Sequence, residues 1–242
     1  MRVHEKYSQL MKDQRDFFNE LITEEWWDYH HADWDTTRRY EVACLFGEIQ
    51  PETILDLGCG CGFHDQVMAE YAFVREVHAV DYSPKSIEKA NEAYPHPKVA
   101  RWCADFAQEP LSGSYDCVTS FQVIEHLEDP KVYFHAAKSV CKPGGHIAVF
   151  TPNLNRLSNL LLRLRCKPAV FCDSQHFIEY TPSSLRDAGK ECGLTPVAFF
   201  GYTLAGLRWI DTQPMEKRLR WGQMLPKIAS HCCPVKPQFL TG

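Results

Sequence analysis

The chain has 242 residues, of which 45% are hydrophobic and 24% charged, and its formal net charge is −5. This length predicts one domain, 1–242, with a sizeable core, and the acidic balance predicts no nucleic-acid partner. The charged N-terminus lacks the apolar stretch of a secretory signal, and no apolar run is long enough to span a bilayer. Eleven cysteines without a Cys-x-x-Cys pair fit a reducing cytoplasmic compartment and predict no metal site.

Two helices, 3–25 and 36–49, are predicted before the first strand. The second repeats apolar residues at three- and four-residue intervals. The stretch between them is dense in aromatic residues and histidine and has no clear period. We expect residues 1–50 to form an N-terminal helical lid.

Short apolar strands alternate with helices from residue 53 onward. The predicted strands are 53–57, 76–80, 98–102, 115–120 and 144–151, and the predicted helices are 65–72, 83–94 and 130–141. Ser83 and Pro84 are typical of an N-cap and a first helical residue. The alternation predicts an α/β fold, with a doubly wound, mostly parallel sheet of the seven-stranded type covered on both faces.

The alternation stops after Pro152. Residues 153–180 are predicted to be an insertion after the fifth strand, within a core of 51–203. A helix at 182–193 and a strand at 194–203 follow, and the tail 204–242 receives no assignment.

Three glycines stand at alternate positions directly behind the first strand, in "ILDLGCGCGFH" (54–64). Ligands of doubly wound sheets bind beyond the carboxyl ends of the strands. Residues without a Cβ allow a ligand close to the main chain, and backbone amides and the next helix N-terminus can face an anion or polar group. The third glycine comes one position too early for the dinucleotide pattern Gly-x-Gly-x-x-Gly.

The spacing Asp-x-Gly-x-Gly-x-Gly resembles motif I of the class I S-adenosylmethionine-dependent methyltransferases. "VHAVDYSP", "CADFAQEPL", "FQVIEHLEDP" and "CKPGGHIAVFTPN" follow in the order of that family's strand motifs. The resemblance covers residues 50–200 and implies a Rossmann-like methyltransferase fold. It also implies S-adenosylmethionine as cofactor and S-adenosylhomocysteine as product.

The resemblance assigns cofactor-binding residues to the first two strands. Asp81 would grip both ribose hydroxyls with its carboxylate, and Tyr82 would offer a flat face to adenine. The loop would hold the methionine part of the cofactor through Asp56, Gly58, Cys59, Gly60 and Gly62.

Further cofactor residues are implied after the third and fourth strands. Asp105 would accept a hydrogen bond from the adenine amino group, with Phe106 as an apolar wall. Phe121 and Gln122 would line the floor of the cofactor site.

Within the predicted lid, Arg39 or its neighbour Arg38 would pair with the cofactor carboxylate, as a similarly placed arginine does in ubiquinone-pathway enzymes. The alternative is a solvated helix face. Tyr29, His30 and Trp34 would close over the substrate, or else pack as an aromatic cluster.

Two histidines are candidates for a general base. His126 follows the fourth strand, where it either takes a proton from the acceptor or packs against Glu125 or Glu128. His176 ends the insertion, near a place where similar small-molecule O-methyltransferases often carry a histidine. It would act as a base, a substrate donor or a structural residue.

The insertion offers two more features. Glu179 and Tyr180 would contact substrate, or else form a capped loop-to-helix junction. Residues 153–167 combine leucines with four basic residues and no acid. They would make peripheral contact with an anionic membrane, or pack as a lid on the protein.

Together these features predict methyl transfer from S-adenosylmethionine to a small-molecule acceptor, at a hydroxyl, by in-line displacement. The alternatives are an N- or C-methyltransferase, including one with a protein or tRNA acceptor, and a regulatory protein that binds the cofactor without turnover.

Overall fold

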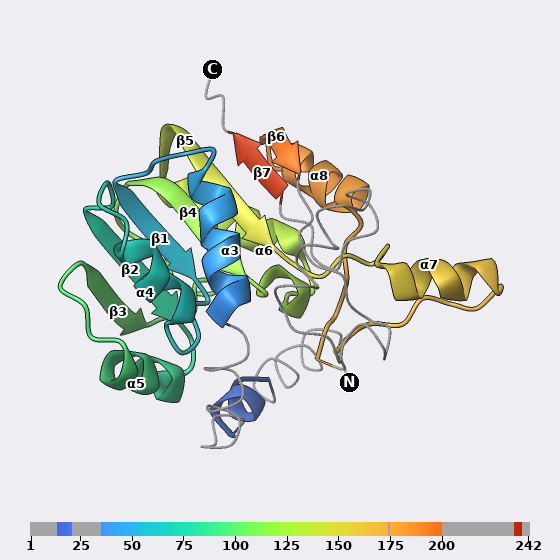
Figure 1. Cartoon of the computed structure of the whole chain (residues 1–242), viewed down its shortest axis with the longest axis horizontal. Helices are drawn as coiled ribbons and strands as arrows, with labels where there is room; N and C mark the ends of the chain where they lie inside the picture. Colours follow the sequence, from blue (N-terminus) through green and yellow to red (C-terminus); the bar gives the residue numbers. More distant parts are fainter. Residues whose placement is uncertain (1–13, 21–34, 174, 200–234, 239–242) are drawn as a thin grey trace.

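The computed structural model describes residues 14–20, 35–173, 175–199 and 235–238. Within them, Figure 1 shows a central sheet flanked by helices, with one helix projecting from the body. Tyr29, His30 and Trp34 lie outside the described residues, as does most of the tail from 204 onward.

The described sheet has seven strands in the order β3-β2-β1-β4-β5-β7-β6. β1 pairs in parallel with both β2 and β4, and β7 is antiparallel to β5 and β6. This order confirms the predicted doubly wound, mostly parallel sheet. The strands are β1 (Thr53–Leu57), β2 (Glu76–Asp81), β3 (Val99–Cys103), β4 (Tyr115–Phe121), β5 (Cys141–Phe150), β6 (Thr195–Phe199) and β7 (Val235–Gln238).

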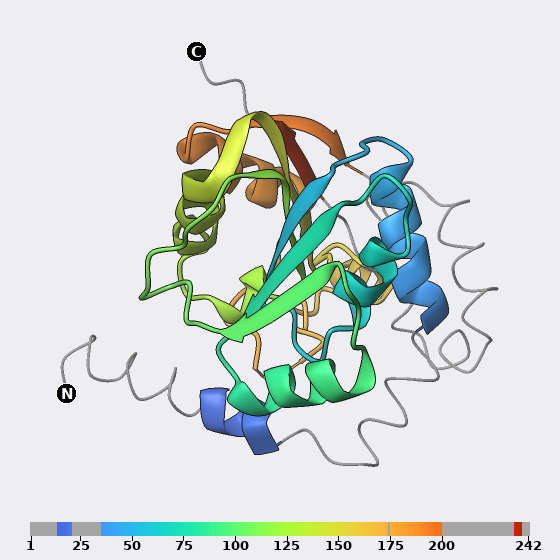
Figure 2. The same cartoon turned by 90° about the vertical axis from the view of Figure 1, so that its left-hand side faces the viewer.

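Helices cover both faces of the sheet. Figure 2 shows α3 (Asp35–Phe46) and α4 (Phe63–Ala69) on one side, and α6 (Pro130–Val140) and α8 (Pro182–Glu191) on the other. All five residues of β1 are buried, as two covered faces require. One core cluster joins α3 and α4 to β1, and the second joins β4 to α6 and α8.

Three of the described helices begin with the same local signal, an N-cap residue followed by proline. α5 (Pro84–Ala93) has Ser83 as its N-cap, whose hydroxyl accepts from the Ser86 amide, as predicted. Asp129 and Thr181 cap α6 and α8 in the same way. Proline fits the first turn because its missing N–H has no helical partner there.

Two described elements lie in segments for which the sequence predicts no helix or strand bounds. The helix in the insertion, α7 (Leu157–Leu164), is shorter than the basic leucine-rich stretch 153–167. Arg156 starts it as the N-cap residue, and Cys166 adopts a positive φ shortly after it ends. β7 lies in the tail, where its four residues carry too little pattern to be predicted.

The carboxyl ends of β1, β2 and β4 meet at one edge of the sheet, where the strand order reverses between β1 and β4. This is where doubly wound folds bind ligands. A short helix at 14–20 lies beside α5 at this edge (Figure 2). Among the described residues, no helix has both the length and the apolar character that crossing a membrane requires.

Candidate functional site

The glycine loop follows β1 and adopts backbone angles that favour glycine. Gly58, Gly60 and Gly62 all have positive φ. A Cβ on Gly58 would lie 2.6 Å from a methyl of Val123, and one on Gly62 would lie 2.9 Å from Cβ of Ala90. A Cβ on Gly60 would have nothing within 4 Å. The outer glycines are therefore needed for packing, and Gly60 leaves the bare surface.

Four amides of this loop are engaged within the protein. The amides of Gly58 and Cys59 donate to the Val80 carbonyl, and the Gly62 amide donates to the Cys59 carbonyl. The Gly60 amide donates to Oδ2 of Asp81 at 2.9 Å. These bonds hold the loop against the end of β2.

Asp81 lies at the end of β2 beside the loop and is 7% exposed. Burial raises the pKa of its carboxyl, and the amides of Ser83 and Gly60 oppose the rise. Each carboxylate oxygen accepts one of these amides, Oδ1 from Ser83 at 2.8 Å and Oδ2 from Gly60. A carboxylate has about four acceptor positions, so lone pairs remain for a second pair of donors.

The helix at 14–20 covers this edge, and it supplies contacts that the sequence prediction missed. Arg15 pairs with Asp105 at 3.3 Å, and its guanidinium carbon lies 5.3 Å from the ring centroid of Tyr82. The Ser83 hydroxyl donates to the Asn19 side chain. The sequence predicts a helix over these residues but does not indicate their partners, which lie in the two loops that follow β2 and β3.

Phe18 of the same helix stands between the two halves of the predicted site. Its ring centroid lies 6.3 Å from that of Tyr82 and 5.2 Å from that of His126. The predicted adenine platform and a candidate base are thus joined through one aromatic side chain. Residues 14–20, part of the predicted lid, thus contact the loops at the carboxyl edge of the sheet.

Asp105 follows β3 and is nearly buried. Besides Arg15, it accepts hydrogen bonds from the Ala107 amide at 3.0 Å and the Gln108 side chain at 2.9 Å. Phe106 packs against the core, with its ring centroid 6.3 Å from that of Tyr133. An incoming donor would therefore share Asp105 with Arg15 and Gln108.

Asp56 and Phe121 both lie inside the protein. The Thr119 hydroxyl donates to Asp56 at 2.8 Å, and burial raises the pKa of Asp56 well above its ordinary value. The Phe121 ring stacks on His64 at 3.7 Å and on Phe150 at 4.5 Å. From these buried positions, Asp56 and Phe121 can support the glycine loop and the predicted floor of the site.

Gln122 has a positive φ of 59° and an exposed side chain, and its amide donates to the Phe150 carbonyl. Non-glycine residues in this region carry strain that tends to be kept at functional sites. Its place directly after β4 agrees with the predicted position in the floor.

The two candidate arginines of α3 have different surroundings. Arg39 forms ion pairs with Glu70 at 2.6 Å and with Asp35 at 2.9 Å, and the Glu70 hydrogen bond raises its pKa. Arg38 is buried over the ring of Phe63, next to the glycine loop, with Cζ 3.6 Å from the ring centroid. Burial lowers the pKa of Arg38 to about 10. Of the two predicted candidates, Arg38 therefore lies beside the loop and Arg39 pairs with carboxylates away from it.

His126 ends the short helix η1 (Ile124–His126) behind β4. Its Nδ1 lies 3.2 Å from the Gln175 carbonyl, which can only accept, so Nδ1 carries the proton. Burial, followed by the proximity of His176, lowers the pKa of His126 to about 4. His126 is therefore a neutral imidazole with an unprotonated Nε2.

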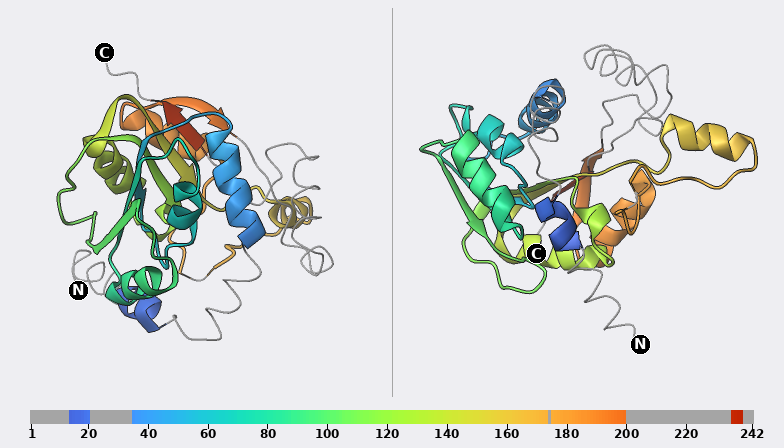
Figure 3. Two further views of the ribbon diagram at one scale, coloured as in Figure 1. Left: turned by 60° about the vertical axis from the view of Figure 1, so that its left-hand side comes forward. Right: turned by 90° about the horizontal axis from the view of Figure 1, so that it is seen from below.

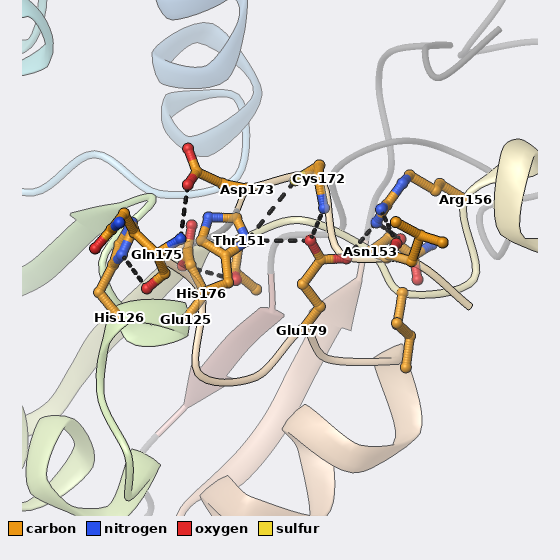
Figure 4. A network of polar contacts seen from close by, with 12 residues as sticks. Glu125, His126, Thr151, Asn153, Arg156, Cys172, Asp173, Gln175, His176 and Glu179 are labelled. Carbon is orange, nitrogen blue, oxygen red and sulfur yellow. Dashed lines mark hydrogen bonds and ion pairs between the residues drawn. The ribbon is translucent and has the colours of Figure 1, made fainter. Parts of the chain in front are cut away.

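His176 meets His126 although the two residues come from separate segments. Their ring centroids are 4.8 Å apart at an interplanar angle of 77°. The amide of Phe177, next to His176, donates to the Glu125 carbonyl at 2.9 Å and fixes the end of the insertion on η1. The structure thus brings the two predicted catalytic residues together (Figure 4).

Glu179 and Tyr180 are buried, which corrects the prediction that they contact substrate. Glu179 accepts from Nδ1 of His176 at 3.0 Å and forms an ion pair with Arg156 (Figure 4). Their neighbour Thr181 caps α8, as the capped-junction alternative predicts.

Glu125 completes the cluster and was not singled out from the sequence. It is fully buried, and burial raises its pKa to about 7 against the influence of His176 and a hydrogen bond from Thr151. The Thr151 hydroxyl donates to Oε2 at 2.9 Å, while Oε1 has no hydrogen-bond partner among the described residues.

This cluster could also hold a metal, although the sequence predicts none. One donor atom each of Glu125, His126 and His176 lie within 4.8 Å of one another. Two imidazoles and one carboxylate suit divalent transition metals. Cys172, His176 and Glu179 form a second such group, but there a cation would compete with Arg156 for Glu179.

The sheet order, the glycine loop after β1 and the carboxylate at the end of β2 together define a class I S-adenosylmethionine-dependent methyltransferase. The family described as "Methyltransferase domain" matches residues 35–198, and the chain belongs to this family. The predicted family and enzyme class are thereby confirmed.

Curated relatives share part of the sequence. The chain is 29% identical over 229 residues to the ubiquinone biosynthesis O-methyltransferase of Cupriavidus pinatubonensis, covering 88% of this chain and 90% of that protein. It is 30% identical over 210 residues to the ubiquinone biosynthesis O-methyltransferase of Alkalilimnicola ehrlichii, covering 81% of this chain and 80% of that protein.

Solved structures share the fold. Magnesium protoporphyrin IX methyltransferase of Synechocystis, with bound S-adenosylhomocysteine, has a TM-score of 0.66 at 16% identity and covers 94% of this chain and 99% of its own. An N-methyltransferase of Bradyrhizobium japonicum, also with S-adenosylhomocysteine, has a TM-score of 0.59 at 15% identity, covering 96% and 97%.

Proposed function

We propose that this methyltransferase transfers its methyl group to a hydroxyl of a small, apolar acceptor, with His176 and His126 lining the acceptor side of the site. The observation that carries the proposal is the contact between the two imidazoles, 4.8 Å apart, next to Phe18 and the cofactor edge. A hydroxyl needs its proton removed when it attacks, and imidazole is the usual base near neutral pH.

The cofactor edge fits an adenosyl group with a charged amino-acid tail. The open surface at Gly60 would receive the tail beside Arg38, whose cation would pair with the carboxylate. Asp81 would take the ribose hydroxyls, and Tyr82 with Asp105 would hold the base. S-adenosylmethionine, when bound, supplies a methyl group already activated on a sulfonium.

His176 is the better placed of the two histidines to take the proton. Its Nδ1–H is hydrogen-bonded to the Glu179 carboxylate, and an anion there favours a positive charge on the ring. His126 has a lowered pKa and remains neutral. The acceptor proton would move to Nε2 of His176 as the acceptor oxygen bonds to the methyl carbon and the carbon–sulfur bond breaks, which would leave S-adenosylhomocysteine. His126 would orient the acceptor and help to exclude water.

The same cluster supports a second candidate for activating the hydroxyl, a divalent cation. The observation that favours it is the donor set of Glu125, His126 and His176, in which Oε1 of Glu125 has no hydrogen-bond partner within the described part of the chain. A cation bound there would lower the pKa of a coordinated hydroxyl. Turnover that disappears in EDTA and returns with added Mg²⁺ or Zn²⁺ would favour the cation, and turnover unaffected by EDTA would favour the base.

The acceptor class is inferred from the relatives and from the projecting helix. The relatives named above act in ubiquinone biosynthesis, and α7 extends away from the sheet (Figure 3). Leu164 at its end is 81% exposed, and the basic residues Arg163, Arg165 and Lys167 are exposed with it. A basic, apolar arm suits an anionic membrane surface, where a lipophilic quinol would be found.

Two further points concern the location of the protein and the alternative functions. The cysteines of the described residues are all free, which supports a reducing cytoplasmic compartment. An N- or C-methyltransferase, or a cofactor-binding protein without turnover, is less well supported, because neither requires a histidine pair next to the cofactor edge.

The test uses catechol as a hydroxyl probe, with the wild type, His176→Ala and His126→Ala. We expect kcat to fall by roughly 10²–10⁴ for His176→Ala, with S-adenosylmethionine affinity preserved within about threefold. A smaller decrease in kcat is expected for His126→Ala. Unchanged kcat in both variants would remove the histidines from the chemistry.

A further inference from the structure

A buried ion pair between Arg156 and Glu179 lies directly behind His176, and the proposed chemistry uses only the negative charge of Glu179. The side chain of Glu179 is 0% exposed and that of Arg156 is 5% exposed. Buried charges of this kind are costly unless each is fully paired. We therefore expect the ion pair to have a role in the fold or in the site.

Both carboxylate oxygens of Glu179 accept hydrogen bonds. Oε1 accepts from Nδ1 of His176 and from the Cys172 amide, and Oε2 accepts from Nη1 of Arg156. Burial alone would raise the pKa of Glu179, but these hydrogen bonds outweigh it and lower the pKa to about 2. Since an arginine guanidinium and a backbone amide both donate to it, Glu179 acts as an acceptor on every side, and Nδ1 of His176 is the nitrogen that carries a proton toward it.

Arg156 holds the carboxylate in place from the other side. Besides Glu179, its guanidinium donates to the carbonyls of Val170 and Asn153. The two carbonyls lie on either side of α7 within the insertion. The Arg156 side chain therefore ties the insertion together and fixes the orientation of Glu179 at the same time.

We propose that Glu179, locked by Arg156, is a positioning residue for His176 and sets its tautomer. With Nδ1 protonated toward Glu179, Nε2 carries the lone pair and is directed away from Glu179. Figure 4 shows His176 lying between His126 and Glu179 in this chain of contacts. The proposal rests on the proposed function for its catalytic meaning, although the tautomer itself is independent of turnover.

The isosteric variant Glu179→Gln separates the charge from the packing. A glutamine can offer its carbonyl oxygen to Arg156 or to His176 but not to both, so one donor would face another donor. We expect the 15N NMR signals of His176, assigned by comparison with His176→Ala, to show a single Nδ1–H tautomer in the wild type. In Glu179→Gln this tautomer should lose its dominance. An unchanged tautomer in Glu179→Gln would overturn the proposal.

Methyl transfer to catechol provides the second readout. We expect Glu179→Gln to lower kcat by roughly tenfold or more and to leave the Kd for S-adenosylhomocysteine within about threefold. In a His176→Ala background the same substitution should have little further effect, because the residue it positions is absent. A decrease in kcat of the same size in both backgrounds would show a merely structural role and overturn the proposal.

Three further variants distinguish a specific effect on His176 from a general loss of stability. Arg156→Lys keeps a cation beside Glu179 and should retain more of the tautomer and of kcat than Arg156→Met, which removes that cation. Asp116→Asn breaks the Lys142 pair, in which the atoms are 2.7 Å apart at the opposite end of β4, and should lower stability without changing the His176 signals. If wild-type turnover itself survived in His176→Ala, the proposed base would be wrong, while the NMR comparison would still decide the positioning role.

Discussion

Oδ2 of Asp81 accepts the amide of Gly60 at 2.9 Å, so the carboxylate at the end of β2 and the bare point of the glycine loop form one unit. The loop amide and the ligand would then be held by the same side chain. Any change at Asp81 should be felt both in the loop and in cofactor affinity.

Asp81→Asn should weaken S-adenosylhomocysteine binding by roughly ten- to a hundredfold, because hydrogen bonds to a charged acceptor contribute about 1.5–3 kcal/mol. Isothermal titration calorimetry measures the Kd directly. Asp116→Asn, at the other end of the sheet, serves as the control and should bind like the wild type. Equal affinities in Asp81→Asn and the wild type would remove the ribose assignment.

Glu125 should make stability depend on pH in a predictable direction. The pKa of Glu125 in the folded protein, about 7, is higher than the pKa of a glutamate in the unfolded chain. The contribution of Glu125 to stability is therefore fully present below the unfolded-state pKa, and it is lost as the pH rises through about 7. Glu125→Gln should therefore gain stability relative to the wild type between pH 5 and pH 8, by about 2 kcal/mol. Urea unfolding in EDTA at both pH values tests this.

His126 contributes with the opposite sign in the wild type. Its folded-state pKa of about 4 lies below the unfolded value, so its contribution to stability grows as the pH rises toward about 6.5. The pH dependence of wild-type stability therefore combines two opposite contributions. The difference in stability between Glu125→Gln and the wild type isolates the contribution of Glu125. A difference that does not change with pH would contradict the buried, titrating carboxyl.

Phe18→Ala should damage the acceptor site more than the cofactor site. The ring bridges Tyr82 and His126, so its removal would open the site to water next to the histidines. We expect kcat/KM for catechol to fall about tenfold, equivalent to 1.4 kcal/mol. Phe17, the next residue on the same helix, is 38% exposed, and Phe17→Ala is the matched control. Equal effects of the two variants would argue against a specific role for Phe18.

Leu164→Glu should abolish binding to vesicles that contain anionic lipid. The substitution places a charge at the exposed end of the proposed membrane arm and opposes the basic residues beside it. Co-sedimentation with phosphatidylglycerol vesicles and with neutral phosphatidylcholine vesicles tests this. Val197→Glu, at a half-exposed position on β6, is the control. Equal sedimentation of the two variants, or none by the wild type, would refute the membrane contact.

The alternation of strands and helices and the spacing of the three glycines were readable from the sequence because each depends on local rules. The short buried strand at 53–57, the N-cap and proline at Ser83 and Pro84, and a turn that only glycine tolerates are encoded within a few residues. The order of the strand motifs then identifies the edge of the sheet at which a ligand binds. The class of enzyme was predicted from the resemblance of these motifs to a known family, and the family match confirms it.

Tertiary structure decided which side chains share that edge. Arg38 and Arg39 are neighbours in sequence, yet packing of α3 on α4 turns one onto Phe63 beside the loop and the other onto Glu70. Helix 14–20 and the end of the insertion reach the site over long stretches of chain, and no local pattern encodes such contacts. The pairing of His126 with His176, and the Glu179 carboxylate behind it, exist only because the insertion folds back onto η1.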